Sequence, residues 1–261
     1  LVRFRKGFAE KIGGWTKVIQ NSYNGTGRKL LGWVDLAGTK LLGLGTRTKL
    51  YIQEGTNFND ITPIRSTTAA GDVTFAATNG SSTLTVTDSA HGASQGDFVT
   101  FSGAASLGGN VIASVLNQEY EIATVPSTST FTITAKDTSG DTVTANASDS
   151  GNGGGSTVGA YQINVGLDVF VDGTGWGASS WGSGTWGSTS SLTNLNQLRL
   201  WSFDSFGEDL IANVRAGGVY YWDTSAKTLG TDRAVELSAL TGANLTPTRG
   251  LQVLVSDVDR H

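Results

Sequence analysis

The sequence contains no cysteine and no methionine, only 3 prolines, and 15% charged residues in a length of 261. Without cysteine the chain can form no disulfide framework, no thiol nucleophile and no cysteine-based metal site. The scarcity of proline excludes a proline-rich disordered chain. No apolar run approaches the roughly 18 residues of a membrane-spanning helix, and no secretory signal pattern is visible.

Negative charge slightly exceeds positive charge, with a net charge of -4 and a pI near 5.1. This balance argues against a nucleic-acid surface over the whole molecule. Positive charge gathers only near the N-terminus, which we interpret as a solvated charged edge. The residues concerned are Arg3, Arg5, Lys6 and Lys11.

Glycine is abundant, with 36 residues, and threonine, serine and asparagine are frequent. This composition is typical of short strands joined by many tight turns. The length is sufficient for one or two domains with sizeable cores. We therefore expect an all-β protein.

Two stretches, residues 32–52 and 200–222, follow the same order of features. In each, a tryptophan-led strand meets a polar, glycine-containing turn, and a second strand and an aromatic third strand follow. The repeat predicts matched positions, namely Leu42 with Ile211, Tyr51 with Tyr220, and Trp33 with Trp201. Repeated antiparallel sheets of this kind are typical of β-propeller blades.

A third repeat is predicted to begin at residues 250–257, so the chain would hold about two and a half blades where a closed propeller needs about four to eight. The first residue is Leu1 and methionine is missing. We therefore expect a truncated segment of a longer polypeptide. Its predicted fold is a set of partial β-propeller blades.

Residues 72–146 differ in composition from the two repeats. They are rich in threonine, serine and valine, and apolar and polar residues alternate cleanly along them. Leu84 and Val86 fall on one face of a predicted strand, as do Val99 and Phe101 on another. The pattern predicts a small β-barrel or β-sandwich inserted between the blades. The expected domains are an N-terminal arm with the first blade over 1–70, an inserted all-β module over 71–150, and a Trp/Gly loop with further blades over 151–261.

The segment that leaves this module, residues 151–156, is rich in glycine. We interpret it as a flexible exit linker.

A histidine with nearby serines and an acid could suggest nucleophilic catalysis. His91 has Ser89, Ser94 and Asp97 close in sequence, but catalysis requires these groups to converge in space. The stretch has the composition of a turn between strands. We interpret His91 as a turn residue that bonds its own loop.

Five acids could supply the carboxylate pair of a glycoside hydrolase. They are Asp35, Asp204, Glu208, Asp209 and Asp223. Because Asp35 and Asp204 fall at matching places in the two repeats, we interpret them as turn residues, whose side chains bond nearby backbone. No catalytic residue is expected.

Metal and cofactor motifs are also missing. The spacing of Asp137, Asp141 and Asp149 lacks the calcium-loop pattern and its closing glutamate. Residues 173–177 are rich in glycine, but no Lys-Ser/Thr pair follows as a phosphate loop requires. We expect neither a metal site nor a bound cofactor.

Trp176, Trp181 and Trp186 recur every five positions in a Gly/Ser background. Exposed rings of this kind can stack on sugars. Large aromatic patches more often mark protein interfaces. We interpret the three residues as an interface with a neighbouring element or subunit.

Four segments carry a resemblance to a known family: residues 8–15, the Trp-Gly repeats at 175–187, the strand-rich stretch 200–223, and residues 255–261. They resemble tail proteins of short-tailed bacteriophages (podoviruses), in particular the tail tubular protein B or nozzle family. Residues 72–146 resemble a small all-β module of phage structural proteins, with a His-Gly-x-Ser-x-Gly-Asp-x-Val motif and a Thr-Phe-Thr-Ile-Thr strand.

The resemblance implies a non-enzymatic virion protein located in the tail. In that family, six copies surround the DNA exit channel below the portal and adaptor. The implied partners are other copies in a hexamer, the tail adaptor and tail fibre proteins, and the phage DNA that passes through the channel. No small-molecule substrate and no membrane span are expected.

Two other functions compete with this one. A receptor-binding or fibre-type phage protein would recognise host surface glycans through the inserted module or the tryptophan array. A polysaccharide depolymerase would rest only on the scattered acids.

Overall fold

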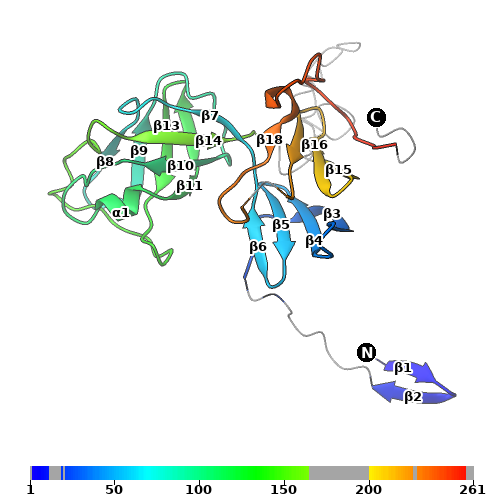
Figure 1. Cartoon of the computed structure of the whole chain (residues 1–261). Helices are drawn as coiled ribbons and strands as arrows, with labels where there is room; N and C mark the ends of the chain where they lie inside the picture. Colours follow the sequence, from blue (N-terminus) through cyan, green and yellow to red (C-terminus); the bar gives the residue numbers. More distant parts are fainter. Residues whose placement is uncertain (1, 12–18, 20, 165–199, 226–227, 257–261) are drawn as a thin grey trace, which may run out of the picture.

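We describe a computed structural model of the chain, over residues 2–11, 19, 21–164, 200–225 and 228–256 (Figure 1). The described residues form antiparallel sheets with very little helix, so the predicted all-β class is confirmed. No sheet among them closes into a barrel.

Two sheets are simple four-stranded meanders. The first meander sheet contains β3 (Gly27–Val34), β4 (Lys40–Thr46), β5 (Leu50–Glu54) and β6 (Asn57–Asp60). The second meander sheet contains β15 (Trp201–Phe206), β16 (Asp209–Val214), β17 (Val219–Trp222) and β18 (Val235–Glu236), followed by the 3-10 helix η2 (Leu237–Ala239). Both repeats therefore form the antiparallel sheets that the sequence predicts.

The predicted equivalence of the two tryptophans is wrong. Trp33 pairs with Leu41 beside the β3–β4 turn, whereas Trp201 pairs with Val214 at the opposite end of its hairpin. The cause is turn length, because residues 35–39 join β3 to β4 while only 207–208 join β15 to β16.

The aromatic third strands are also offset by one residue. When Leu42 is matched with Ile211, the pairing places Tyr51 opposite Leu44 and Val219 opposite Asn213. Tyr51 therefore corresponds to Val219 and not to Tyr220. A shift of one residue sends a side chain to the other face of a sheet. Tyr220 accordingly lies in the core, while Tyr51 packs with Tyr23 and Phe58.

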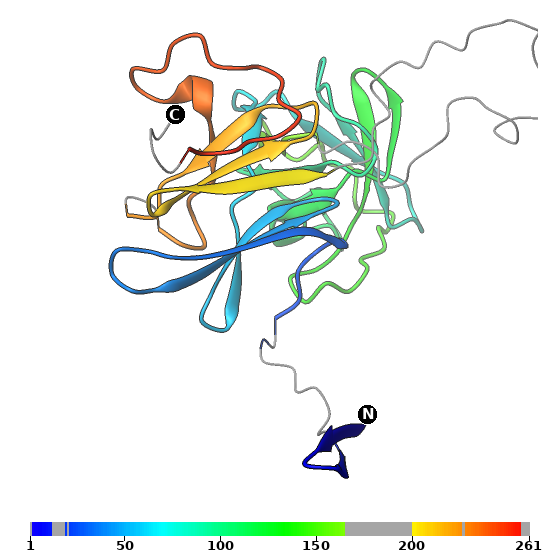
Figure 2. The same ribbon diagram turned by 90° about the vertical axis from the view of Figure 1, so that its right-hand side faces the viewer.

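The two meander sheets pack on each other through one apolar core, and Figure 2 shows the second sheet lying across the first. Gly45 makes this close packing feasible, because a Cβ there would lie 2.5 Å from the Trp201 ring and 2.7 Å from Phe203. The core residues are Leu41, Leu50, Ile52, Ile61, Ile163, Trp201, Phe203, Leu210, Ala212, Val214, Tyr220, Trp222 and Ala234.

Indole hydrogen bonds run in both directions between these sheets. Trp33 of the first sheet donates from Nε1 to the Glu208 carbonyl at 2.8 Å, and Trp201 of the second donates to the Thr46 carbonyl at 2.7 Å. A buried indole N–H normally finds such a partner. The two bonds fix the sheets at both ends of their contact.

The inserted module contains two four-stranded sheets. One has the order β11 (Glu119–Glu121), β10 (Phe98–Ser102), β14 (Val158–Gln162) and β7 (Ile64–Thr67). The other has the order β12 (Thr124–Ser127), β13 (Thr130–Thr134), β9 (Thr83–Thr87) and β8 (Thr74–Ala77). A single helical turn, α1 (Ala113–Leu116), lies between β10 and β11.

These sheets share one core, as in a sandwich. Leu84 and Val86 are both fully buried in it, and Val99 and Phe101 reach it from the other sheet, as the alternation predicts. The strands of the module run from Ile64 to Gln162, which is wider at both ends than the predicted 71–150. The chain enters along β7 and leaves along β14, and these two strands pair with each other.

The glycine-rich exit is not a free linker. Gly151 N–H donates to the Leu107 carbonyl, Phe75 N–H donates to the Asn152 carbonyl, and Ala105 N–H donates to the Gly153 carbonyl. Gly153 has a positive φ of 89°, and a Cβ there would lie 2.6 Å from the Phe75 ring. These glycines therefore serve close backbone packing, and the prediction of a flexible linker is wrong.

The remaining strands are β1 (Val2–Arg5) and β2 (Phe8–Lys11), which form a separate N-terminal hairpin (Figure 1). The predicted third repeat fails over its described part, because residues 251–256 form no strand. That segment runs alongside β15, where the Asp204 carboxylate accepts from the Val255 N–H at 2.8 Å.

Candidate functional site

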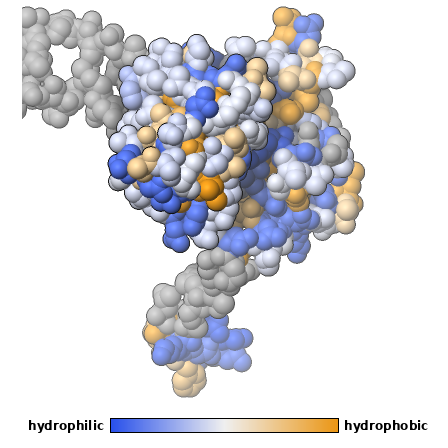
Figure 3. Space-filling model, turned by 90° about the vertical axis from the view of Figure 1, so that its left-hand side faces the viewer, coloured by the Kyte–Doolittle hydropathy of each residue, from blue (hydrophilic) through white to orange (hydrophobic). Residues whose placement is uncertain are grey.

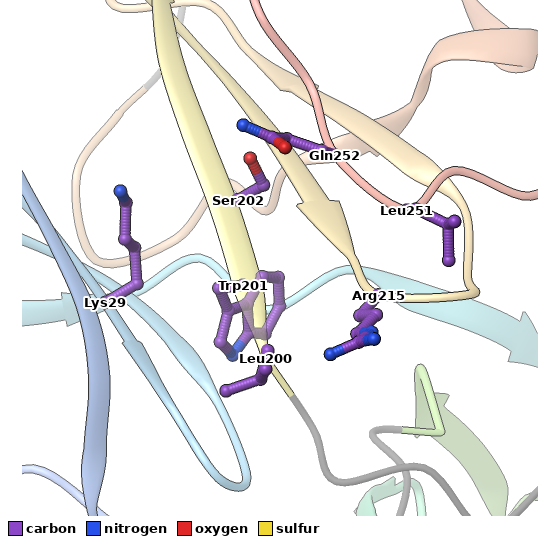
Figure 4. A pocket seen from close by; sticks show the side chains of 7 residues that line it. All are labelled: Lys29, Leu200, Trp201, Ser202, Arg215, Leu251 and Gln252. Carbon is purple, nitrogen blue, oxygen red and sulfur yellow. The ribbon is translucent and has the colours of Figure 1, made fainter.

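An open pocket of about 360 Å³ lies where the C-terminal segment passes β15 and β16 (Figure 4). Ser202 fixes one wall, since its hydroxyl bonds both the carbonyl and the N–H of Val253 at 3.2 Å. Arg215 follows β16 and its N–H donates to the Leu200 carbonyl at 2.9 Å. The lining residues are Lys29, Leu200, Trp201, Ser202, Arg215, Leu251 and Gln252.

The polar chemistry of this pocket suits binding more than catalysis. Lys29 and Arg215 are exposed cations, and Gln252 adds an amide. Among the described lining residues there is no carboxylate and no histidine. Glycoside hydrolysis needs two carboxylates. The pocket can hold a small anionic or polar group, but its lining does not supply a hydrolytic pair.

His91 is a turn residue, as the sequence predicts. Its Nδ1 accepts from the Ala93 N–H at 3.0 Å, and its Nε2 lies 3.1 Å from the Ser127 carbonyl. With Nδ1 accepting, Nε2 is the ring nitrogen that donates to the Ser127 carbonyl. Both ring nitrogens are thereby occupied, while Asp97 accepts from the Ser94 N–H at 2.8 Å. The cluster is not a catalytic triad.

Asp35 and Asp204 have different structural roles. Asp35 accepts from the Thr39 N–H at 2.7 Å within the β3–β4 turn, which confirms its turn role. Asp204 lies within β15 opposite Ile211, so its predicted turn role is wrong. It anchors the C-terminal segment through its bond to Val255.

The other three acids sit around the β15–β16 turn. Asp209 accepts from the Tyr221 hydroxyl at 2.5 Å and from the Thr224 N–H at 2.8 Å. Glu208 accepts from the Leu36 N–H at 3.1 Å. Asp223 accepts from the N–H of Ser225 at 2.9 Å. Each carboxylate holds a turn, and none of these bonds joins two of the carboxylates as a hydrolytic pair.

Negative charge is nevertheless concentrated at this corner of the fold. Burial, the hydrogen bond to Asp209 and the charges of Asp209, Asp223 and Glu208 together raise the pKa of Tyr221 above its ordinary value.

Among the described residues, no group of three or more His, Asp or Glu side chains is placed to hold a metal ion. Asp137 accepts from the N–H groups of Ser139 and Asp141, both at 2.9 Å, and so closes its own turn. Asp149 does the same for Asn146 at 2.8 Å. Trp176, Trp181 and Trp186 lie outside the described residues, and so does the segment 173–177.

Sequence reasoning missed a buried ionic junction between the inserted module and the first meander sheet. The Lys49 side chain is only 3% exposed, and its Nζ lies 2.7 Å from Asp60 and 2.5 Å from Glu119 of the module. Nζ also lies 4.5 Å from the centre of the Phe98 ring. Arg233, which lies just before β18 of the second meander sheet, has its Nη1 2.5 Å from the Asp60 carboxylate. The junction therefore joins all three parts of the fold.

The charges of the junction balance one another. Burial acts to raise the pKa of Asp60, but the positive charges of Lys49 and Arg233 and its hydrogen bonds outweigh burial and hold that pKa below its ordinary value. Gln162 donates from Nε2 to the Glu119 carboxylate and completes the set. The only sequence signal for this site is a lysine directly before a strand of buried residues.

No helix in the described part of the chain has the length and apolar character needed to cross a membrane.

Comparison with known proteins gives little. No family model and no curated protein matches the chain. Among solved structures, one similar chain is described as "Phage phi92 endosialidase", with a TM-score of 0.25 and 17% identity over 76% of this chain. This chain spans 28% of the length of that protein. At that TM-score the likeness carries no inference about fold or activity.

Proposed function

We propose that this protein is a non-enzymatic structural subunit of a bacteriophage tail. Two observations support this. Residues 200–223, which carry part of the resemblance to phage tail proteins, build the second meander sheet. The acids considered as a carboxylate pair hold turns and segments in place.

The proposal depends most on where residues 200–223, which resemble phage tail proteins, lie in the fold. Trp201 in this stretch is 5% exposed and bonds the first meander sheet, so this motif residue takes part in the contact between the two sheets. A fold assembled from repeated sheets is well suited to act as a scaffold.

The specific role that we propose is the nozzle of a short phage tail. Six copies would surround the DNA exit channel, in contact with the tail adaptor and the tail fibres, and phage DNA would pass through the ring. Electron microscopy of the assembled particle, with this protein labelled, tests the role. A ring on the tail axis is expected, and a peripheral appendage would contradict it.

The second candidate is a fibre-type protein that binds host surface glycans. The pocket lined by Lys29 and Arg215 is the observation that favours it, because cationic side chains suit acidic sugars. Titration of acidic polysaccharide fragments against the protein and against Arg215→Ala tests it. Binding that is lost in the variant would support the glycan function over the nozzle.

The proposal also expects no polysaccharide hydrolysis. Reducing-end assays on host polysaccharide should show no cleavage by the purified chain. Cleavage that disappears in Asp35→Asn or Asp204→Asn would overturn the non-enzymatic assignment.

A further inference from the structure

The N-terminal hairpin is complete as a local structure but is exposed along both strands. Lys6 and Gly7 form its turn with positive φ angles of 51° and 83°, the geometry that favours a two-residue hairpin loop. Phe4 is 79% exposed and Phe8 is 76% exposed. A lone two-stranded hairpin is marginally stable in water at best. We therefore expect it to pack on a partner.

The hairpin is both apolar and basic. Its register places Val2 and Phe4 on one face, with Phe8 on the other. Arg3 pairs with Glu10 at 3.0 Å, which leaves the charges of Arg5, Lys6 and Lys11. Figure 3 shows hydrophilic and hydrophobic surface side by side on the hairpin, at the bottom of the view.

A surface of opposite charge lies where the turns of the two meander sheets meet. Leu36 is 90% exposed, Val34 55% and Phe206 38%. The bonds from the Leu36 N–H and the Trp33 indole to Glu208 bring the β3–β4 turn, with Leu36, against the β15–β16 turn. We call this area the turn-end surface.

Four carboxylates lie at the turn ends of the two sheets. They are Asp35, Glu208, Asp209 and Asp223, and the charges of the last three add to burial in raising the pKa of Tyr221. Lys40, which pairs with Val34 in the sheet, adds one positive charge near these carboxylates. The turn-end surface is thus apolar and acidic where the hairpin is apolar and basic.

We propose that the β1–β2 hairpin of one copy docks on the turn-end surface of a second copy of this chain. The inference deepens the proposed function and rests on it for the presence of neighbouring copies. Complementary charge would orient the contact, and one exposed ring, Phe4 or Phe8, would supply its apolar centre, because the two rings lie on opposite faces of the hairpin. Such a head-to-tail contact uses two different surfaces of each copy, and it closes into a ring when the rotation allows.

Self-association of the full 261-residue chain, measured by analytical ultracentrifugation, tests the contact. Phe4→Asp with Phe8→Asp on the hairpin should weaken association at least about 10-fold, and so should Leu36→Asp on the turn-end surface. Leu245→Asp is the matched control, because Leu245 is 96% exposed and lies outside both surfaces, so association should not change. Circular dichroism melts check that every variant folds.

A mixing experiment separates docking between copies from docking within one chain. The hairpin variant and the Leu36→Asp variant should each stay monomeric alone, yet form a 1:1 complex together, because each supplies the surface that the other lacks. If the mixture stays monomeric, or if wild type never associates, the inference is wrong. If the hairpin variant associates like wild type, the inference also fails, but a ring built through other contacts and the proposed function would stand.

A charge exchange adds a second readout. Lys6→Glu should weaken association, and Glu208→Lys in the same chain should restore part of it. Loss without any restoration would contradict the charge complementarity on which the docking rests.

Discussion

The first meander sheet makes two contacts of opposite chemistry. On one side, Gly45 leaves room for the Trp201 and Phe203 rings of the second meander sheet to pack closely in an apolar core. On the other side, Lys49 meets Asp60 and Glu119 at the inserted module. The first contact depends on shape, and the second depends on the balance of buried charges. The two contacts should therefore respond to different substitutions and to different solution conditions.

The largest effect is expected at the ionic junction. Lys49→Met removes the cation shared by Asp60 and Glu119 while Arg233 still pairs with Asp60, so the cost in unfolding free energy should be at most the roughly 3–5 kcal/mol of a broken buried pair. Denaturant titration measures this loss. Lys40→Met is the control, because Lys40 is exposed and its loss should cost less than about 0.5 kcal/mol. Equal effects of the two variants would show that the junction does not depend on charge.

The shape-dependent contact should respond to a single methyl group. In Gly45→Ala the new Cβ would lie 2.5 Å from the Trp201 ring, so the sheets must shift, at a cost of about 1–3 kcal/mol. Gly32→Ala is the control on the neighbouring strand, because its Cβ would meet no atom closer than 3.9 Å. Thermal melts should separate the two variants, and a similar stability for both would contradict the packing.

Acid should weaken the ionic contact and leave the apolar one. Because the folded-state pKa of Asp60 is lowered, its contribution is fully present above the unfolded value of about 3.9 and is lost as the pH falls through the folded value. One proton changes the unfolding free energy by at most about 1.4 kcal/mol per pH unit. Unfolding measured at stepwise lower pH should show a shallower loss in Asp60→Asn than in wild type. Parallel curves would exclude Asp60 as a source of the acid sensitivity.

The smallest effect is expected from one indole hydrogen bond. Trp33→Phe keeps a ring at the half-buried edge of the contact but removes the donor to the Glu208 carbonyl, at a cost of about 1 kcal/mol. Trp201→Phe should cost more, since Trp201 is 5% exposed and its loss also leaves a gap. The order of the two melting temperatures checks this, and the reverse order would contradict the burial difference.

Sequence patterns correctly predicted those features, such as strand faces and turn residues, that depend on contacts between residues close in sequence. The alternation of Leu84 and Val86 identified the core face of β9, and the turn-like sequence around His91 identified its role, because its N–H donor Ala93 is two residues away. The turn role of Asp35, directly after β3, was predicted from the same kind of local signal.

The errors arose where distant contacts or turn lengths decide. The mismatch between Tyr51 and Tyr220 follows from turns of different length, which a comparison of spacings does not reveal. The burial of Lys49 depends on Glu119, which is 70 residues further along the chain. The glycines of 151–156 are ordered by backbone bonds to segments that precede them by many residues.

The order in which these contacts can form has a consequence for synthesis on the ribosome. The Trp201–Thr46 bond joins residues 155 positions apart, so the core face of the first meander sheet stays uncovered until its partner sheet emerges. At a synthesis rate of about 5–20 residues per second, that interval lasts roughly 10–30 s. The inserted module, whose paired strands all lie between Ile64 and Gln162, can fold within that time. During that time the nascent chain exposes apolar core residues to chaperones and to aggregation with other chains. These residues are Leu41, Leu50 and Ile52.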